Sequence, residues 1–218
     1  MPLLPRPDEK LMIFIDGSNL FRQSKKYAND NNTDCNIDLI KLREKLVQDY
    51  NLIRAYYYFS IPVLKKEEDE IQEDMNEDEI QRIKQRREKI QNQINTQIKL
   101  KHFLEYNGFD VACFPLRTRE KIIHCPVCEK DSSIEIWAEK GVDVALVTEM
   151  MFQSASNRCD VVIIVAGDLD YSEAIRRIKQ RGIKVKIAFF KSLTSPDFIR
   201  CADEFIDIEE FLSEIQRK

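Results

Sequence analysis

The segment Val161–Ile178, VVIIVAGDLDYSEAIRRI, constrains the fold more than any other stretch of the chain. Its first five residues are aliphatic and mostly β-branched, without polar alternation, which is typical of a strand buried on both faces of a parallel sheet. Gly167 then allows a sharp turn, and Asp168 and Asp170 follow at the carboxyl end of the strand, before an amphipathic helix. Open α/β sheets bind ligands beyond these strand ends. The segment therefore predicts a central strand that presents two carboxylates to a ligand.

The same pattern occurs near the beginning of the sequence. A short apolar strand, Leu11–Ile15, leads directly into Asp16, Gly17, Ser18 and Asn19. Ser18 or Asn19 can cap the helix that follows. The repeat of strand, carboxylate and glycine indicates that this segment forms the second half of the same site.

Further apolar segments alternate with helical periodicity along the chain. Strands are expected at 52–59, from 109, at 183–190 and at 205–208, with a helix at 36–48. Gly108 and Gly182 each precede a strand and follow a helix, as left-handed helix caps do. The pattern predicts an α/β fold, a Rossmann-like doubly wound parallel sheet with strand order about 3-2-1-4-5. In that order the strands ending at Asp16 and Asp168 are neighbours at the switch point.

The length of 218 residues indicates a single domain, 1–218, carrying two insertions. The first, at about 65–106, has an acidic block, a basic block and isoleucines at helical spacing, which predicts a long helix or a helical hairpin. A solvated crossover helix is the simplest interpretation of it. The alternatives are a homodimerisation arm and a cap that faces the substrate.

The second insertion, at about 116–137, reads as a β-hairpin or a loop. It contains His124, Cys125 and Cys128, which have the spacing of half a zinc site. A second pair of ligands at the right spacing is missing from the sequence. Free thiols at a hairpin tip are therefore the preferred interpretation, and Zn²⁺ is the alternative.

Charge and hydropathy limit the partners of the chain. The net charge is −4, so a polyanion would have to be held by a local patch or through metal ions. The first residues, MPLLPRPDEK, lack the apolar core of a signal peptide, and no apolar run has the length of a membrane span. We expect a cytoplasmic protein without a membrane partner.

The candidate catalytic residues in the sequence are carboxylates. Asp16, Asp168, Asp170 and also Asp143, at the start of the helical run 144–154, are expected to converge, and they would repel one another unless cations were bound. Oxygen ligands of this kind select Mg²⁺ or Mn²⁺, which can activate water and stabilise charge on a phosphoryl group. Glu149 is a weaker candidate ligand, because it is about 240° around the helix from Asp143.

Other common catalytic groups and nucleotide-binding motifs are missing from the sequence. Its two histidines lie in the insertions, which makes a histidine-based triad improbable, and neither GxGxxG nor GxxxxGK[ST] is present. Ser18 and Ser172 have no evident base beside them, and they are interpreted as helix caps or phosphate contacts.

Four blocks in the same order resemble the NYN family, also called LabA-like or DUF88, of the PIN-like nuclease superfamily. They are MIFIDGSNLF at 12–21, EKGVDVALVTEM at 139–150, CDVVIIVAGDLDYSEAIRRIKQRGIKVKIAFF at 159–190 and SPDFIRCADEFIDI at 195–208. The resemblance covers most of the sheet but neither insertion. Glu149 stands where many members carry aspartate, and Leu169 where serine is frequent.

The resemblance implies a PIN-like fold and hydrolysis of RNA that depends on divalent metal ions. It assigns Asp16, Asp143, Asp168 and Asp170 to the acidic positions of the family, and Asn19 to its asparagine after the first strand. Phosphate contacts are then expected from Arg22, Lys25, Lys140 and Arg176.

Two alternatives to a ribonuclease remain at this point. One is an RNA-binding or regulatory module with weak catalytic activity or none. The other is a phosphohydrolase of the haloacid dehalogenase type. That chemistry needs aspartates two residues apart after the first strand, and Ser18 occupies the second of these positions.

Overall fold

The computed structural model describes residues 8–64, 75–124, 131–156 and 158–217. The chain forms two compact units. The first comprises Met1–Phe59, Leu104–Ala112 and Val142–Lys218, and the second comprises Ser60–Phe103 and Cys113–Gly141. Most of the two stretches expected as insertions therefore falls in the second unit.

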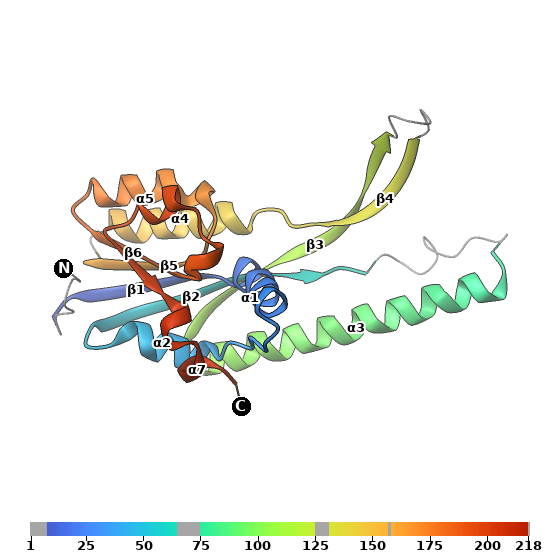
Figure 1. Ribbon diagram of the computed structural model, residues 1–218, viewed down its shortest axis with the longest axis horizontal. Helices are drawn as coiled ribbons and strands as arrows, with labels where there is room; N and C mark the ends of the chain where they lie inside the picture. Colours follow the sequence, from blue (N-terminus) through green and yellow to red (C-terminus); the bar gives the residue numbers. More distant parts are fainter. Residues whose placement is uncertain (1–7, 65–74, 125–130, 157, 218) are drawn as a thin grey trace. The chain divides into compact units, whose positions relative to one another are not determined.

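Parallel strands form the centre of the first unit (Figure 1). Strand β1 (Lys10–Asp16) pairs in parallel on one side with β2 (Asn51–Pro62) and on the other with β5 (Val161–Val165). The sheet continues in parallel through β6 (Lys184–Phe189) to β7 (Glu204–Asp207). The predicted contact between the first strand and the Val161 strand is confirmed, because Ile15 is in register with Val165.

The sheet is mixed rather than wholly parallel, which corrects the prediction. The hydrogen-bonded strand order is β4-β3-β2-β1-β5-β6-β7. Strand β3 (Phe109–His124) pairs antiparallel with β4 (Asp131–Ala138), so the second insertion is a hairpin. The connection between β3 and β4 is short, and consecutive strands joined in this way pair antiparallel, because a parallel pair needs a long crossover.

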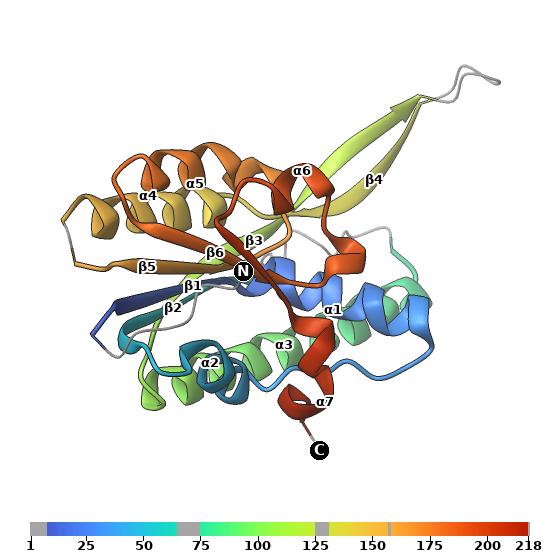
Figure 2. The ribbon, with the colours of Figure 1, turned by 60° about the vertical axis from the view of Figure 1, so that its left-hand side comes forward.

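Helices cover both faces of the sheet in the first unit. Helices α4 (Val142–Ala155) and α5 (Ser172–Lys179) lie on one face, and α1 (Gly17–Asn31) and α2 (Leu39–Val47) lie on the other (Figure 2). Shorter elements complete this unit: η2 (Leu169–Tyr171), η3 (Lys191–Leu193), α6 (Pro196–Ile199), η4 (Ile208–Phe211) and α7 (Leu212–Ile215). Among the described residues, no helix has the length and apolar character needed to cross a bilayer.

The long helix predicted for the first insertion is α3 (Glu77–Tyr106). A reciprocal capping box begins it, because the Glu79 backbone N–H donates to the Asn76 side chain and the Asn76 backbone N–H donates to the Glu79 carboxylate, both at 3.0 Å. Its isoleucine stripe is half-buried at Ile80 and Ile83 but 38% exposed at Ile98. The stripe is therefore only partly covered.

Three consecutive tyrosines of β2 are buried in the first unit. The side chains of Tyr56, Tyr57 and Tyr58 are between 5% and 8% exposed. Burial, reinforced by the charge of Glu149, raises the pKa of Tyr56 to about 12. Burial likewise raises the pKa of Tyr57, with Asp16 adding to the effect, and that of Tyr58, with Glu149 adding to it. All three hydroxyl groups hold their protons more firmly in the folded chain than in the unfolded chain.

We expect the protein to lose stability steeply above pH 10. The folded pKa values lie above the unfolded value near 10, so the stabilisation is complete below pH 10 and is lost as the pH rises through the folded values. Each tyrosine contributes a slope of about 1.4 kcal/mol per pH unit, so the three together lower the free energy of unfolding by about 4 kcal/mol at pH 11. Urea unfolding at pH 8, 9, 10 and 11 measures this loss.

Two variants identify which residues cause the fall in the free energy of unfolding with pH above pH 10. Tyr58→Phe is expected to reduce the slope by about 1.4 kcal/mol per pH unit, the share of one tyrosine. Tyr106→Phe is the control, because the Tyr106 side chain is 92% exposed, and the slope should stay unchanged. Equal slopes in Tyr58→Phe and the unmodified chain would contradict the assignment.

Candidate active site at the ends of β1 and β5

Asp16 is the last residue of β1. It is also the N-cap of α1, which corrects the prediction that Ser18 or Asn19 caps this helix. Its side chain is 3% exposed, and its Oδ1 accepts a hydrogen bond of 2.8 Å from the backbone N–H of Asn19. An N-cap carboxylate also interacts favourably with the positive end of the helix. The junction of strand and helix thus fixes a buried carboxylate at the place that the sequence predicted.

Asn19 connects the two strand ends. Its side-chain oxygen accepts a hydrogen bond of 3.1 Å from the backbone N–H of Gly167, just beyond β5. Asn19 is 5% exposed. In this structure the residue holds the loops after β1 and β5 together, and its predicted contact with substrate stays a prediction.

The hydroxyl group of Tyr171 lies between two of the predicted carboxylates. It is 2.8 Å from Oδ2 of Asp16 and 2.9 Å from Oδ1 of Asp143, the second residue of α4. The phenol is 1% exposed. Burial is the main reason that the pKa of Tyr171 is raised, and the charges of Asp16 and Asp143 add to it. Tyr171 therefore stays protonated and brings together carboxylates from distant parts of the sequence.

One hydroxyl proton cannot serve two acceptors at the same time. At any moment Tyr171 donates to Asp16 or to Asp143, and the other carboxylate faces an oxygen without a proton between them. Two carboxylates this close to one oxygen repel each other, and a cation bound between them would relieve that repulsion. Asp143 is exposed, so solvent and ions can reach its carboxylate.

Asp168 and Asp170 follow β5 as predicted. The Asp168 side chain caps η2 by accepting a hydrogen bond of 3.1 Å from the backbone N–H of Asp170. Asp168 is half-buried and Asp170 is exposed. Their roles as catalytic residues or metal ligands remain predictions.

Glu149, the weaker candidate, lies among aromatic residues. Its Oε1 accepts a hydrogen bond of 2.6 Å from Gln153, and its carboxylate raises the pKa values of Tyr56 and Tyr58. These contacts are on α4 and β2, and the structure gives Glu149 no role at the Tyr171 hydroxyl.

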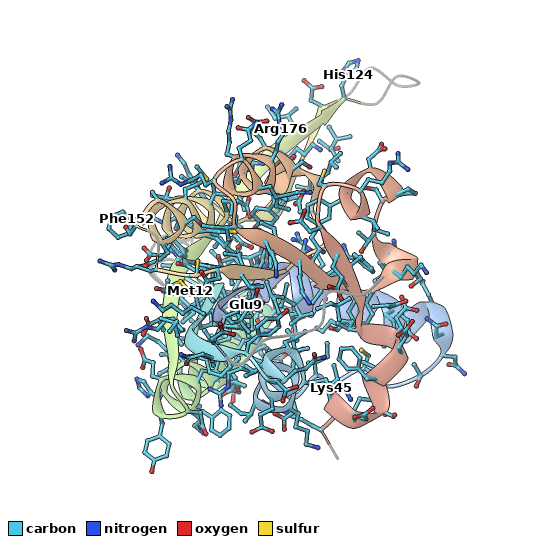
Figure 3. The ribbon with its side chains drawn as sticks, turned by 90° about the vertical axis from the view of Figure 1, so that its left-hand side faces the viewer. Glu9, Met12, Lys45, His124, Phe152 and Arg176 are labelled. Atoms are coloured by element: carbon cyan, nitrogen blue, oxygen red, sulfur yellow. The ribbon has the colours of Figure 1, made fainter. Side chains whose placement is uncertain are left out.

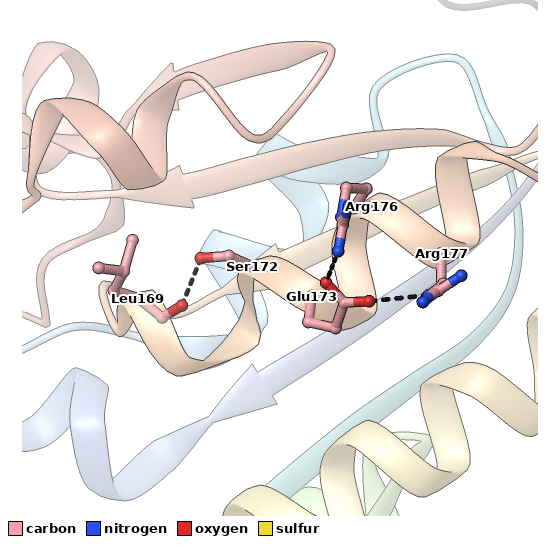
Figure 4. A network of polar contacts seen from close by, with 5 residues as sticks. All are labelled: Leu169, Ser172, Glu173, Arg176 and Arg177. Atoms are coloured by element: carbon pink, nitrogen blue, oxygen red, sulfur yellow. Dashed lines mark hydrogen bonds and ion pairs between the residues drawn. The ribbon is translucent and has the colours of Figure 1, made fainter.

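Polar candidates on the following helix already have partners. The Ser172 hydroxyl group donates to the Leu169 carbonyl oxygen, and Arg176 and Arg177 both bond the Glu173 carboxylate (Figure 4). Ser172 thus makes a local hydrogen bond but does not cap α5, which has no side-chain N-cap. Arg176 remains exposed, so a phosphate could compete for its guanidinium group.

The other predicted phosphate contacts vary in setting. Arg22 and Lys25 are exposed on α1, with the Lys25 ammonium group 4.2 Å from the centre of the Phe21 ring. Ser18 is half-buried in the first turn of α1, and Lys140 is an exposed residue of the second unit. Their contacts with substrate remain predictions.

The proposed half zinc site falls partly outside the described residues. Cys125 and Cys128 lie there. His124, at the end of β3 (Figure 3), has its Nδ1 2.9 Å from a carboxylate oxygen of Asp131. Zinc binding remains an untested alternative.

The described residues contain no group of three or more His, Cys, Asp or Glu side chains arranged to hold a metal ion. They contain a pair of carboxylates, Asp16 and Asp143, whose oxygens lie 2.8 and 2.9 Å from the same phenol oxygen. Carboxylate oxygens are the donors that hard divalent cations prefer. The donor chemistry thus suits Mg²⁺ or Mn²⁺. Asp168 and Asp170, which precede Tyr171 in the sequence, are the predicted additional donors.

Sequence reasoning missed Tyr171. The available signal was its place directly after Asp-Leu-Asp, at the start of an amphipathic helix. A tyrosine that is expected to be buried usually needs a polar partner for its hydroxyl group.

Carboxylates at the ends of adjacent parallel strands in an α/β sheet are the arrangement expected of a PIN-like nuclease fold. The chain belongs to the NYN family, since the sequence model of the NYN domain matches residues 10–209. NYN domains are PIN-like, so the predicted resemblance is confirmed.

Solved structures support the fold. The crystal structure of a protein of unknown function from Vibrio parahaemolyticus RIMD 2210633 is similar, with a TM-score of 0.60 at 21% sequence identity. The similarity covers 94% of this chain and 96% of that one. A search of curated proteins gives no match.

Proposed function

We propose that the protein is a divalent-metal-dependent endoribonuclease that hydrolyses phosphodiester bonds of RNA. The observation that carries the proposal is the shared hydroxyl group of Tyr171. It gathers Asp16 and Asp143, two carboxylates from distant parts of the sequence, at one point. Membership of a family in the PIN-like nuclease superfamily supports the same reaction class.

Each residue of the site has a defined task in this proposal. Asp16 and Asp143, together with Asp168 and Asp170, would hold one or two Mg²⁺ or Mn²⁺ ions. A bound ion of this kind supplies water activation and stabilises charge on the phosphoryl group. Asn19 fixes the spacing of the two strand ends, and Tyr171 orients the two carboxylates. Arg22, Lys25, Lys140 and Arg176 would contact phosphates.

This protein would act on RNA in the cytoplasm. The homodimer predicted through α3 finds no support in the fold or in the comparisons, and it is not part of this proposal. A module that binds RNA without cleaving it is the competing function, and the experiment below distinguishes the two.

Removal of divalent ions tests the function directly. A fluorescently labelled single-stranded RNA should be cleaved in 5 mM Mn²⁺ or Mg²⁺, and EDTA should abolish cleavage until divalent ions are added again in excess. Products with internal 5′ and 3′ ends identify endonucleolytic action. RNA binding without turnover under all these conditions, by a folded protein, would overturn the proposal in favour of the binding module.

A further inference from the structure

The β3–β4 hairpin of the second unit carries a row of positive charge on one face. Its register places Arg117 opposite Ala138, Arg119 opposite Ile136 and Lys121 opposite Ile134. Side chains alternate between the faces of a strand, and residues directly opposite each other share a face. Three cations on β3 and three aliphatic residues on β4 therefore form two adjacent rows on the same face of this ribbon.

The three cations lie at the surface of the hairpin. Arg117, Arg119 and Lys121 are exposed, and they make no ion pair with any residue in the described parts of the chain. Glu120 alternates with them and so lies on the opposite face of β3. A carboxylate next to them in the sequence therefore does not compensate their charge.

The aliphatic row gives the ribbon a second property. Ile136 and Ala138 are half-buried, and Ile134 is 43% exposed. Apolar stems of arginine and lysine pack on such neighbours while their charged ends stay in water. The cations are thus held in an ordered row beside an apolar strip.

We propose that this basic ribbon, Arg117, Arg119 and Lys121, binds the phosphates of single-stranded RNA, while Ile134, Ile136 and Ala138 face its sugars and unstacked bases. The inference rests on the proposed function, because both name RNA as the ligand. Successive cations are about 6.6 Å apart along the strand, which is close to the separation of phosphates on an extended nucleic-acid strand. In a chain of net charge −4, a polyanion needs a local basic surface of this kind.

A single strand is favoured over a duplex and over a membrane. One row of cations follows one phosphate backbone, and the deep, narrow major groove of duplex RNA does not admit a ribbon. An interfacial membrane anchor would be expected to carry its aromatic residue beside the cations. Trp137 is instead opposite Thr118, on the other face of the ribbon.

The salt dependence of RNA binding tests the ribbon. The 218-residue chain carrying Asp16→Asn, kept in EDTA so that the RNA stays intact, is titrated into a labelled 20-nucleotide single strand at 50 to 300 mM salt. Replacing Arg117, Arg119 and Lys121 with alanine should remove three phosphate contacts. The slope of log affinity against log salt should fall by about 2, and the affinity at 100 mM salt by on the order of 10- to 100-fold.

Two further variants act as controls. Replacing the exposed residues Arg82, Lys84 and Lys89 of α3 with alanine changes the net charge equally and should leave the slope unchanged. The double variant Arg117→Lys, Arg119→Lys keeps the charges and should keep most of the slope. If the alanine variant does not fold, replacing the same three residues with glutamine removes the charges in longer side chains and should give the same loss of slope.

The outcomes separate this inference from the proposed function. If the unmodified chain cleaves RNA and the alanine variant keeps the same salt slope, the proposal that the basic ribbon binds RNA is wrong, and the proposed nuclease function is unaffected. If RNA binding depends on the ribbon but no cleavage occurs, the proposed nuclease function is wrong, and the proposal that the ribbon binds RNA stands. Equal losses in both alanine variants, or ribbon-dependent binding to vesicles with 30% phosphatidylserine but not to RNA, would overturn the ribbon as an RNA site.

Discussion

Asp16→Asn is expected to lower the rate of RNA cleavage by on the order of 10³-fold and to leave the fold intact. The substituted side chain keeps an oxygen that can accept from the Asn19 backbone N–H, which now bonds Oδ1 at 2.8 Å. Its new amide group can donate to the Tyr171 oxygen, so that Tyr171 donates to Asp143 alone. If Asp16 is a metal ligand as proposed, its loss removes several kcal/mol of transition-state stabilisation, which corresponds to that factor. Single-turnover cleavage with excess enzyme measures it.

The control addresses the simplest alternative, which is that Asp16 only caps a helix. Asp38 caps α2 in the same way, because its side chain accepts from the backbone N–H groups of Ile40 and Lys41. Asp38→Asn should therefore cleave RNA at the rate of the unmodified chain. Comparable activity of Asp16→Asn and Asp38→Asn, at equal melting temperatures, would show that Asp16 has no part in catalysis.

Strand ends were the predictable part of this site. Uninterrupted aliphatic runs identify β1 and β5, and parallel pairing brings their carboxyl ends to the same edge of the sheet. Asp16 and Asp168 could therefore be placed from local sequence alone. The role of Tyr171 could not, because it depends on three segments, around Asp16, Asp143 and Tyr171, whose meeting no local pattern encodes.

The glycines also differ in how much of their role the sequence predicts. Gly108 and Gly182 were predicted as left-handed helix caps, and their φ angles of +80° and +82° confirm it. Gly17 and Gly167 were connected only with bends near carboxylates. A Cβ on Gly17 would lie 2.2 Å from the Tyr57 ring, and one on Gly167 would lie 2.5 Å from the Phe189 ring. Such close approach is a property of tertiary packing, which the sequence does not display.

Tyr171→Phe is expected to lower the free energy of unfolding in EDTA by about 2 to 3 kcal/mol. The change removes the one donor that faces both Asp16 and Asp143, and hydrogen bonds to charged groups contribute about 1.5 to 3 kcal/mol. The ring itself stays, so the apolar packing of this fully buried position is retained. Urea unfolding at pH 7.5 in EDTA measures the loss. Tyr27→Phe is the control, since the Tyr27 ring stacks on Phe190 and that contact needs no hydroxyl group.

A divalent cation should restore most of the stability that Tyr171→Phe loses. Without the phenol proton, the repulsion between the two carboxylates is greater, and a cation that binds between them only in the folded chain stabilises that chain. Adding 5 mM Mn²⁺ should therefore raise the melting temperature of Tyr171→Phe by more than that of the unmodified chain or of Tyr27→Phe. If Mn²⁺ stabilises all three proteins equally, the Asp16 and Asp143 pair does not bind the ion. In that case Tyr171 serves only to hold the sheet and α4 together.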